Sequence, residues 1–306
     1  MNVFNQAITW LLPVIPKPIV RKVSERYIAG ATLDDAITTL RQLNAKGAMA
    51  TVDVLGEFIR TLGEARTNTR YCCEVIRRIH RDGLPGNLSI KLTSLGLAID
   101  SSACEMNVRE ILVTARENSN MFVRMDMENS PYTTQTIDLY RKLRKEFTNV
   151  GVVLQAYLRR TPEDVDSLLA EGAANGVRTN VRLCKGIYVE AEAIAYQSRK
   201  EIQNNYLVSL EKLLSARAYV GIATHDDVLI NGAKQLIEKH RITKEEFEFQ
   251  MLLGVRENVR DILVREGYRL RVYVPFGQDW YGYSLRRLKE NPKMAGYIVK
   301  ALLMGR

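Results

Sequence analysis

The chain has 306 residues, of which 46% are hydrophobic and 26% charged, so it encodes a folded protein of one large or two ordinary domains; wholesale disorder and low-complexity architecture are excluded. Its 44 Lys and Arg residues outnumber its 35 Asp and Glu residues, and the net charge of +9 favours an anionic partner such as a phosphate cofactor, an acidic substrate, a lipid headgroup or nucleic acid. The four cysteines form no C-x-x-C pair, which disfavours a zinc ribbon or a disulfide framework and fits a reducing cytosol.

The first 45 residues predict an N-terminal helical segment. The uncharged run at residues 1–16 is too short to span a bilayer, is broken by two prolines and lacks the features of a signal peptide. Residues 10–26 have an apolar face and a basic face. This pattern suits either packing against the rest of the protein or contact with anionic lipid, and we prefer the first interpretation. Thr32 with Asp35 predicts the start of a further helix, which Gly47 ends.

Eight short runs rich in β-branched and aliphatic residues follow, and segments with helical periodicity separate them. Two helical segments have start signals, namely Thr161 before Pro162, and Thr243 with Glu246 in a capping box. The eight runs in chain order are AMATVDVLGE from Ala48, NLSIKLTSL from Asn87, MFVRMDME from Met121, GVVLQAY from Gly151, TNVRLCKG from Thr179, AYVGIATH from Ala218, FEFQMLLG from Phe247 and LRVYVPFG from Leu270.

The alternation of strands and helices predicts a (β/α)8 barrel of the TIM type. Repeated strand and helix units imply parallel pairing through right-handed crossovers, and eight units over about 240 residues have the size of such a barrel. A doubly wound sheet is the alternative, but no G-x-G-x-x-G turn or G-x-x-x-x-G-K-[ST] loop is present. We expect an N-terminal helical segment at residues 1–45 and a barrel catalytic domain with a C-terminal helix at residues 46–306.

Polar side chains crowd the carboxyl ends of the predicted strands, where a barrel of this type builds its active site. Inward-facing positions are normally Val, Ile and Leu, because charged groups lose hydration there unless a ligand or a network compensates. We therefore predict a polar ligand site at these ends. The residues concerned are Asp53, Glu57, Lys91, Asp126, Glu128, Gln155, Arg182, Lys185, Thr224, His225, Gln250 and Tyr273.

The segment after the last strand, WYGYSLRRLKENP, adds more cations to this site. Arg286 and Arg287 follow Tyr283 at helical spacing, and two guanidinium groups above a barrel mouth are suited to bind one carboxylate.

Other chemistry finds weaker support in the sequence. Lys91 is suited to form a Schiff base, so a lyase or aldolase on the same barrel is the main alternative. A metal site at His225 is disfavoured because no other histidine has matching ligand spacing, and no G-x-S-x-G turn is present. Cys184 is interpreted as a small buried hydrophobe. A non-catalytic binder of membranes or nucleic acid has only the net charge in its favour, and no nucleic-acid-binding motif is found.

Eight motifs in order, one at each strand end or just beyond the last, together resemble proline dehydrogenase. They are SIKLTSLG with Lys91, the D-x-E of Asp126 and Glu128, VVLQAY, VRLCKGIY, ATHD, FQMLLG, VYVPFG and YSLRRLKEN. The match runs from about Asp53 to Asn291, and the chain length resembles that of the single-function bacterial form.

The resemblance implies a flavoprotein that binds FAD and catalyses the first step of proline catabolism. L-proline is oxidised to 1-pyrroline-5-carboxylate by hydride transfer from the ring carbon next to the nitrogen, and the electrons pass to a quinone. The implied location is the cytoplasm, with peripheral contact at the inner face of the membrane left open, and no nucleic acid or metal is expected.

The resemblance also implies roles for individual residues. Asp126 and Arg182 are the implied catalytic residues, with Arg182 beside the reactive flavin nitrogen, where a cation stabilises the reduced ring. The implied proline-binding residues are Lys91, Tyr273, Tyr283, Arg286 and Arg287, and the implied FAD-binding residues are Met127, Gln155, Arg182, Lys185, Gly186, Ile187, Tyr188, Thr224, His225 and Gln250. Val189 stands where many relatives carry a bulky aromatic, so the pocket around the flavin is expected to differ there.

Overall fold

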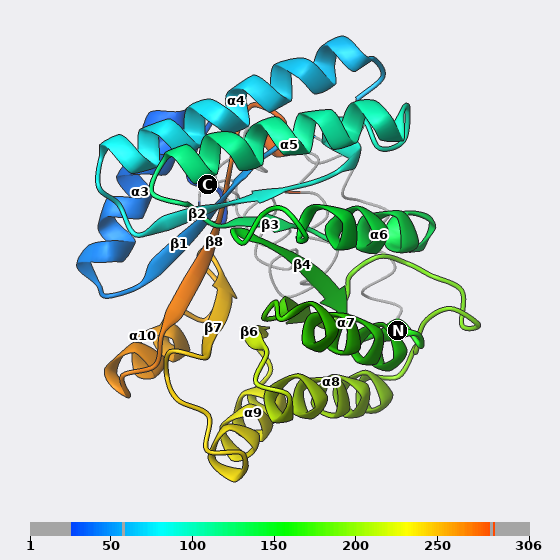
Figure 1. Ribbon diagram of the computed structural model, residues 1–306. Helices are drawn as coiled ribbons and strands as arrows, with labels where there is room; N and C mark the ends of the chain where they lie inside the picture. Colours follow the sequence, from blue (N-terminus) through cyan, green and yellow to red (C-terminus); the bar gives the residue numbers. More distant parts are fainter. Residues whose placement is uncertain (1–25, 57–58, 282–283, 285–306) are drawn as a thin grey trace, which may run out of the picture.

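The computed structural model describes residues 26–56, 59–281 and 284, and its centre is a closed barrel of eight parallel strands in the order β1 to β8 (Figure 1). The predicted (β/α)8 fold is confirmed, and the doubly wound alternative is wrong. The strands are β1 (Met49–Val54), β2 (Gly86–Ile90), β3 (Val123–Met125), β4 (Val150–Gln155), β5 (Asn180–Cys184), β6 (Tyr219–Ala223), β7 (Phe247–Leu252) and β8 (Leu270–Phe276).

Helices surround the strands, as Figure 1 shows. They are α3 (Leu33–Ala45), α4 (Leu62–Arg81), α5 (Ser101–Glu117), α6 (Thr133–Leu143), α7 (Thr161–Asn175), α8 (Arg199–Ser215), α9 (Asp227–Lys239) and α10 (Glu257–Arg265), with short 3₁₀ helices η2 (Thr93–Leu95) and η3 (Ser130–Tyr132).

The first and last strands close the barrel. They pair in parallel from Met49 opposite Arg271 to Val54 opposite Phe276, so no strand of the barrel is left as an open edge. Helix α3 packs against both of these strands, and its Leu40 and Leu43 belong to the same apolar cluster as the barrel. The boundary expected between residues 45 and 46 remains a prediction.

Local sequence signals account for two helix starts and fail at a third position. The Thr32 hydroxyl accepts from the Asp35 N–H, and the Asp35 carboxylate accepts from the Thr32 N–H at 2.9 Å, which completes the predicted capping box of α3. Helix α7 begins at Thr161 with proline in its first turn, as predicted. The helix expected at Thr243 is absent: Glu246 accepts from the Thr243 N–H at 2.9 Å in a turn that leads directly into β7.

The hydrophobic core lies between the strands and the helices, and not inside the barrel. Outward-facing residues such as Val52, Leu88, Val181 and Ile222 are fully buried against the helices. The alternate positions, which face the interior, are largely polar or glycine, including Arg124, Arg182, Glu248, Gln250 and Arg271. This placement leaves the barrel interior available for hydrogen-bonded chemistry.

None of the helices in the described part of the chain combines the length and the apolar character needed to cross a bilayer. The basic amphipathic segment at residues 10–26 lies outside the described residues except for its last residue, so its contact with lipid stays a prediction.

Gly151 in β4 leaves room for the buried guanidinium of Arg124. A Cβ at this position would lie 2.5 Å from Arg124 Nη1 and 2.9 Å from the backbone oxygen of Asn180, which cannot move aside. We expect Gly151→Ala to lower the free energy of unfolding by about 1–3 kcal/mol through overpacking, measured by urea denaturation.

Gly63 near the start of α4 is the control for this substitution. Its added Cβ would meet only Thr61 Oγ1, at 3.7 Å, so Gly63→Ala should leave stability unchanged or raise it by up to about 1 kcal/mol. Equal stability of the two variants would contradict our account of the interior.

Candidate active site

The ion pair between Arg182 of β5 and Asp126, the residue after β3, lies at the centre of the site. Arg182 Nη1 donates to Asp126 Oδ1 at 2.7 Å, and the two side chains are only 7% and 12% exposed. Two strands that do not pair with β5 supply further acceptors: Nη2 donates to Ser89 Oγ of β2 at 3.1 Å, and Nε donates to Gln250 Oε1 of β7 at 2.5 Å. Because all three donor directions are engaged, the plane of the guanidinium is fixed.

Tyr273 of β8 and Lys91 extend this network towards β1. The Tyr273 hydroxyl donates to Asp126 Oδ2 at 2.7 Å, and Lys91 Nζ donates to Tyr273 Oη at 3.3 Å and to Asp53 Oδ1 at 2.6 Å. The Arg182 guanidinium lies 5.4 Å from the centre of the Tyr273 ring. Strands from opposite ends of the sequence therefore contribute to one chain of hydrogen bonds.

Burial sets the protonation of two groups in this network. Burial raises the pKa of the Asp53 carboxyl. The Lys91 ammonium lowers this pKa, and the nearby Asp126 carboxylate raises it. Burial, reinforced by the Asp126 and Asp53 carboxylates, raises the pKa of Tyr273 well above its ordinary value. The phenol therefore stays protonated and acts as a hydrogen-bond donor to Asp126.

A second polar layer lies deeper in the barrel, below Gln250. The Glu248 carboxylate accepts from Arg271 at 2.7 and 3.0 Å, from the Tyr219 hydroxyl at 2.9 Å and from Gln250 Nε2 at 2.6 Å. Burial opposes its charge, but the ion pair and hydrogen bonds with Arg271 outweigh burial and hold the Glu248 pKa at about 2.

Arg124 of β3 is buried in this layer and bonds to neutral oxygens. It donates to the backbone oxygens of Val152 and Asn180 at 3.0 and 3.1 Å and to Asn180 Oδ1 at 2.6 Å. Burial, together with the charge of Arg182, lowers the Arg124 pKa to about 9.

Gln155 at the end of β4 has an unsatisfied acceptor. Its Nε2 donates to the backbone oxygen of Met127 at 3.0 Å, while its buried Oε1 has no hydrogen-bond partner. A buried polar atom without a partner costs free energy, so this oxygen suits a ligand N–H donor. The ring N–H of a flavin is such a donor, so the unsatisfied oxygen of Gln155 fits the group that the resemblance implies.

The chain at residues 185–188 passes close to Tyr157. Tyr157 N donates to the Lys185 backbone oxygen at 2.8 Å, and Gly186 adopts a φ of +98° with a hypothetical Cβ only 2.0 Å from the Tyr157 ring. Only glycine fits this turn. Ile187 is 46% exposed and Val189 is fully exposed, so nothing in the described structure covers Val189.

Thr224 and His225 lie at the entry to α9. Thr224 Oγ1 accepts from the Asp226 N–H at 3.1 Å, and His225 Nε2 accepts from the Leu252 N–H at 2.9 Å. Asp226 caps α9 and also accepts from Arg199 at 3.0 Å, with the half-exposed Lys185 ammonium 3.8 Å away. These two cations lie close to Asp226, directly after the predicted FAD-binding residues Thr224 and His225.

The structure therefore brings Lys91, Asp126, Arg182, Gln250 and Tyr273 into one network. Three predicted substrate-binding residues, Tyr283, Arg286 and Arg287, lie outside the described residues. Asp53 was predicted only as a polar residue at a strand end, and the sequence assigned no role to Ser89, Glu248 and Arg271. Their polar side chains at inward positions of otherwise aliphatic strands are a signal that could have found them.

Cys184 and Glu128 have structural roles here. Burial raises the pKa of the Cys184 thiol to about 11, as expected for a small hydrophobe and not for a nucleophile. Glu128 accepts from the Thr93 N–H at 3.0 Å and holds the start of η2. Within the described ranges, no three His, Cys, Asp or Glu side chains form a cluster that could hold a metal.

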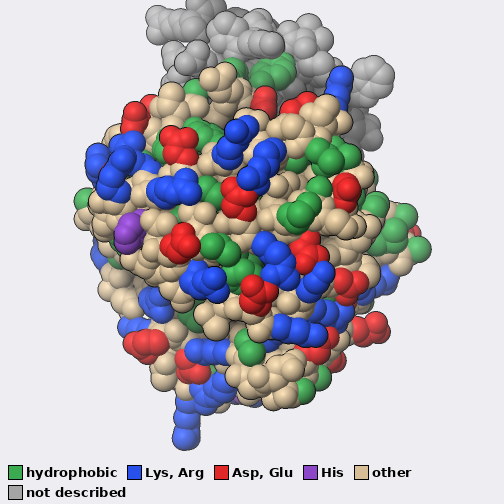
Figure 2. All heavy atoms as spheres, turned by 45° about the horizontal axis from the view of Figure 1, so that its top comes forward, with side chains coloured by type: hydrophobic (Ala, Val, Ile, Leu, Met, Phe, Trp, Pro, Cys, Tyr) green, Lys and Arg blue, Asp and Glu red, His purple; other side chains and the backbone are tan. Residues whose placement is uncertain are grey.

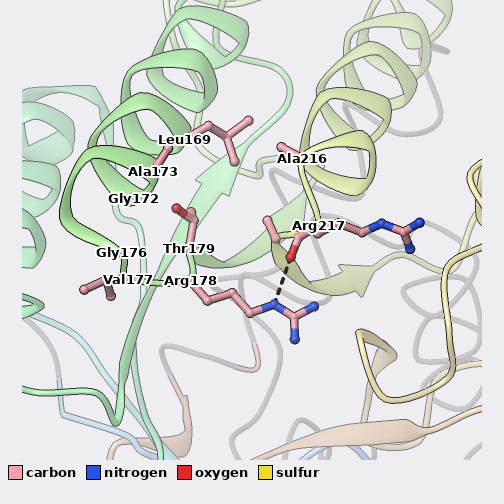
Figure 3. A pocket seen from close by; sticks show the side chains of 10 residues that line it. Leu169, Gly172, Ala173, Gly176, Val177, Arg178, Thr179, Ala216 and Arg217 are labelled. Atoms are coloured by element: carbon pink, nitrogen blue, oxygen red, sulfur yellow. Dashed lines mark hydrogen bonds between the residues drawn. The ribbon is translucent and has the colours of Figure 1, made fainter.

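A hollow of about 270 Å³ lies at the opposite end of the barrel, between the end of α7 and the residues that precede β6. Figure 3 shows Arg178 at its rim donating to the Arg217 backbone oxygen, at 2.8 Å. Both arginines also pair with Glu246. This end of a (β/α)8 barrel normally serves stability, and we assign no chemistry to the hollow.

The outer surface in Figure 2 carries Lys and Arg interspersed with Asp and Glu. A nucleic-acid-binding face would show a stripe of one sign. The net positive charge is therefore not gathered into such a stripe on this face.

A closed (β/α)8 barrel with a charged network at the carboxyl ends of its strands defines the class of barrel enzymes. The family model described as proline dehydrogenase matches residues 36–299, and the chain belongs to the proline dehydrogenase family.

Individual relatives agree with this membership. The chain is 40% identical over 282 residues to proline dehydrogenase 2 of Bacillus subtilis strain 168, covering 92% of this chain and 91% of the relative. It is 35% identical over 288 residues to proline dehydrogenase of Deinococcus radiodurans, with coverage of 92% and 91%.

A solved structure with a similar fold is proline utilization A from Bdellovibrio bacteriovorus inactivated by N-propargylglycine, with a TM-score of 0.82 and 28% identity. The similarity covers 87% of this chain and 32% of that one, so this chain spans about a third of the length of that solved protein.

Glu248 makes stability depend on pH in acid. Its pKa is about 2 in the folded protein, against about 4.3 for an unfolded glutamate, so its contribution is complete above pH 4.3 and is lost as pH falls towards 2. We expect a loss of about 3 kcal/mol in the free energy of unfolding over this window. Glu248→Gln should show a flatter profile in urea denaturation at pH 5, 4 and 3, and identical profiles would refute the assignment.

Proposed function

We propose that this protein oxidises L-proline to 1-pyrroline-5-carboxylate with FAD as the hydride acceptor and a quinone as the final electron acceptor. Membership of the proline dehydrogenase family makes the chain an oxidoreductase that acts on proline in the first step of proline catabolism. The observation that carries the finer proposal is the buried network of Arg182, Asp126, Tyr273 and Lys91, which presents fixed charges beside the unsatisfied Gln155.

The cofactor residues are proposed from the resemblance and the fit of the site. Bound FAD would supply the electron sink that no amino-acid side chain provides. Gln155 offers its free acceptor, Gly186 permits a close approach of the chain, and Lys185 offers a half-exposed cation suited to phosphate. The full proposed set is Met127, Gln155, Arg182, Lys185, Gly186, Ile187, Tyr188, Thr224, His225 and Gln250.

Arg182 and Lys91 are proposed to prepare the substrate amine. Hydride can leave the carbon next to nitrogen only when that nitrogen is neutral, and two nearby positive charges lower the pKa of an amine. Asp126 already accepts hydrogen bonds from Arg182, Ser89 and Tyr273. We therefore propose that Asp126 holds Arg182 and Tyr273 in place and is not the base that removes the amine proton.

Tyr273 and Lys91 are proposed to bind the proline ring and carboxylate. The Tyr273 hydroxyl bonds to Asp126, which fixes the ring of Tyr273 as a packing surface. Lys91 Nζ lies 2.6 Å from Asp53, and this carboxylate favours the charged ammonium needed to hold an anion. Arg286, Arg287 and Tyr283 complete the proposed substrate set.

The same contact weighs against a Schiff-base lyase. A Schiff base requires Lys91 Nζ to reach a substrate carbonyl, whereas this nitrogen donates to Asp53 Oδ1 at 2.6 Å and to Tyr273 Oη at 3.3 Å. Borohydride reduction in the presence of a carbonyl substrate should leave the mass of the protein unchanged, and a covalent adduct on Lys91 would support the lyase.

A quinone acceptor would bring the protein to the membrane, and a cytoplasmic location with peripheral contact is proposed on this ground. The support is the basic amphipathic pattern of residues 10–26. Sedimentation with anionic vesicles should show less binding after removal of residues 1–26 if this segment makes the contact.

Flavin content is the direct test of the proposed function. The purified protein should show the absorbance bands of oxidised flavin, and L-proline should bleach them under anaerobic conditions, whereas D-alanine serves as a non-substrate control. A protein that neither contains nor takes up FAD, or whose flavin is not reduced by proline, would overturn the proposal.

The proposed carboxylate-binding cations give a second test. A charge-assisted hydrogen bond contributes about 1.5–3 kcal/mol, so Arg286→Ala, Arg287→Ala and Lys91→Met should each lower kcat/KM for proline by about one to two powers of ten. Arg287→Lys keeps the charge but loses the planar fork, and should still raise KM while flavin content stays at the wild-type level. Wild-type kcat/KM in all these variants would contradict the substrate assignment.

A further inference from the structure

Glu248 is a buried charged group that the proposed mechanism does not use. It lies in β7 two residues before Gln250, so both side chains face the barrel interior, and Glu248 is only 2% exposed. Its pairing with Arg271 would satisfy the charge without any further contact, yet Glu248 Oε1 also accepts from Gln250 Nε2 at 2.6 Å.

This additional contact determines which end of the Gln250 amide faces Arg182. An amide has an oxygen that accepts and a nitrogen that donates, whereas a guanidinium only donates. With its nitrogen bonded to Glu248, Gln250 presents its oxygen to Arg182 Nε at 2.5 Å. The reversed amide would place N–H against N–H at Arg182 and oxygen against oxygen at Glu248.

The neighbouring strands keep both members of this contact in place. Arg271 of β8 makes two hydrogen bonds to the Glu248 carboxylate, which fixes its plane. In β6, Gly221 stands opposite Glu248, and a Cβ there would lie 2.5 Å from Gln250 Nε2. The absence of a side chain at Gly221 therefore leaves the space that the Gln250 amide occupies.

We propose that Glu248 is a positioning residue for Arg182 and acts through Gln250. The proposal rests on the proposed function, in which Arg182 acts on the flavin and the substrate. Arg182 has two further acceptors, Asp126 and Ser89, at its other nitrogens. The Nε contact is the third point, which prevents the guanidinium from tilting about the line between the other two.

The experiment measures the rate of flavin reduction by L-proline in stopped flow, with holoenzyme of known FAD content. Glu248→Leu/Arg271→Leu removes both members of the ion pair, so no unpaired charge stays buried. We expect a rate at least tenfold below that of the wild type, with KM for proline changed less than threefold because Lys91 is untouched. Gln250→Met should lower the rate by a similar factor.

Combination of the variants separates positioning from a general structural effect. If Glu248 acts only through Gln250, adding Glu248→Leu/Arg271→Leu to Gln250→Met should lower the rate less than twofold further. Should the double replacement not fold, Glu248→Asp is used instead, because it keeps the charge but withdraws the carboxylate from Gln250. We expect Glu248→Asp to lower the rate of flavin reduction at least fivefold in the wild-type background. In the Gln250→Met background it should cause no further loss of rate.

Tyr219→Phe is the matched control. It removes a hydrogen bond from the same carboxylate at Oε2, whereas the contact with Gln250 is made by Oε1. The rate should stay within twofold of the wild type.

The outcomes distinguish this inference from the proposed function. A wild-type protein that proline reduces, with the Glu248 variants within twofold of its rate, would overturn the inference alone. The inference would also be overturned if the loss of rate in the combined variant equalled the product of the losses in the separate variants. A wild-type protein whose flavin proline does not reduce would overturn the proposed function, and the inference with it.

Discussion

A charged side chain buried inside the closed barrel loses its hydration, so its charge is tolerated only where other strands supply hydrogen-bond partners. Arg182 is satisfied by three acceptors from separate parts of the barrel, and Glu248 by donors from β6, β7 and β8. The apolar residues pack instead between strands and helices. The interior side chains are consequently held in position by the fold itself, before any ligand binds.

The barrel interior holds two polar layers: an upper layer around Arg182 and Asp126 and a lower layer around Glu248 and Arg271. In the lower layer Glu248 and Arg271 form a neutral ion pair, and the influence that we propose for this pair on the site passes through Gln250. The upper layer holds the charges proposed to face substrate and flavin.

The barrel was predictable from the sequence because eight aliphatic runs alternate with helical segments. Residues at the strand ends were also found, since Lys91, Asp126, Arg182 and Tyr273 interrupt apolar runs. Glu248 was not found, because FEFQM predicts a half-buried strand without showing that both of its faces are enclosed. The capping-box pattern at Thr243 stabilises a turn and not a helix. The same four residues fit either structure, and the β-strand that follows them decides between the two.

Because β1 pairs with β8, closure of the barrel also determines when the protein can fold during its synthesis. Arg271 and Tyr273, the partners of Glu248 and Asp126, belong to β8, the last of the eight barrel strands to leave the ribosome. Until that strand joins β1, the nascent chain carries an open strand edge and carboxylates without their final donors. Closure of the barrel therefore has to wait until β8 has been synthesised.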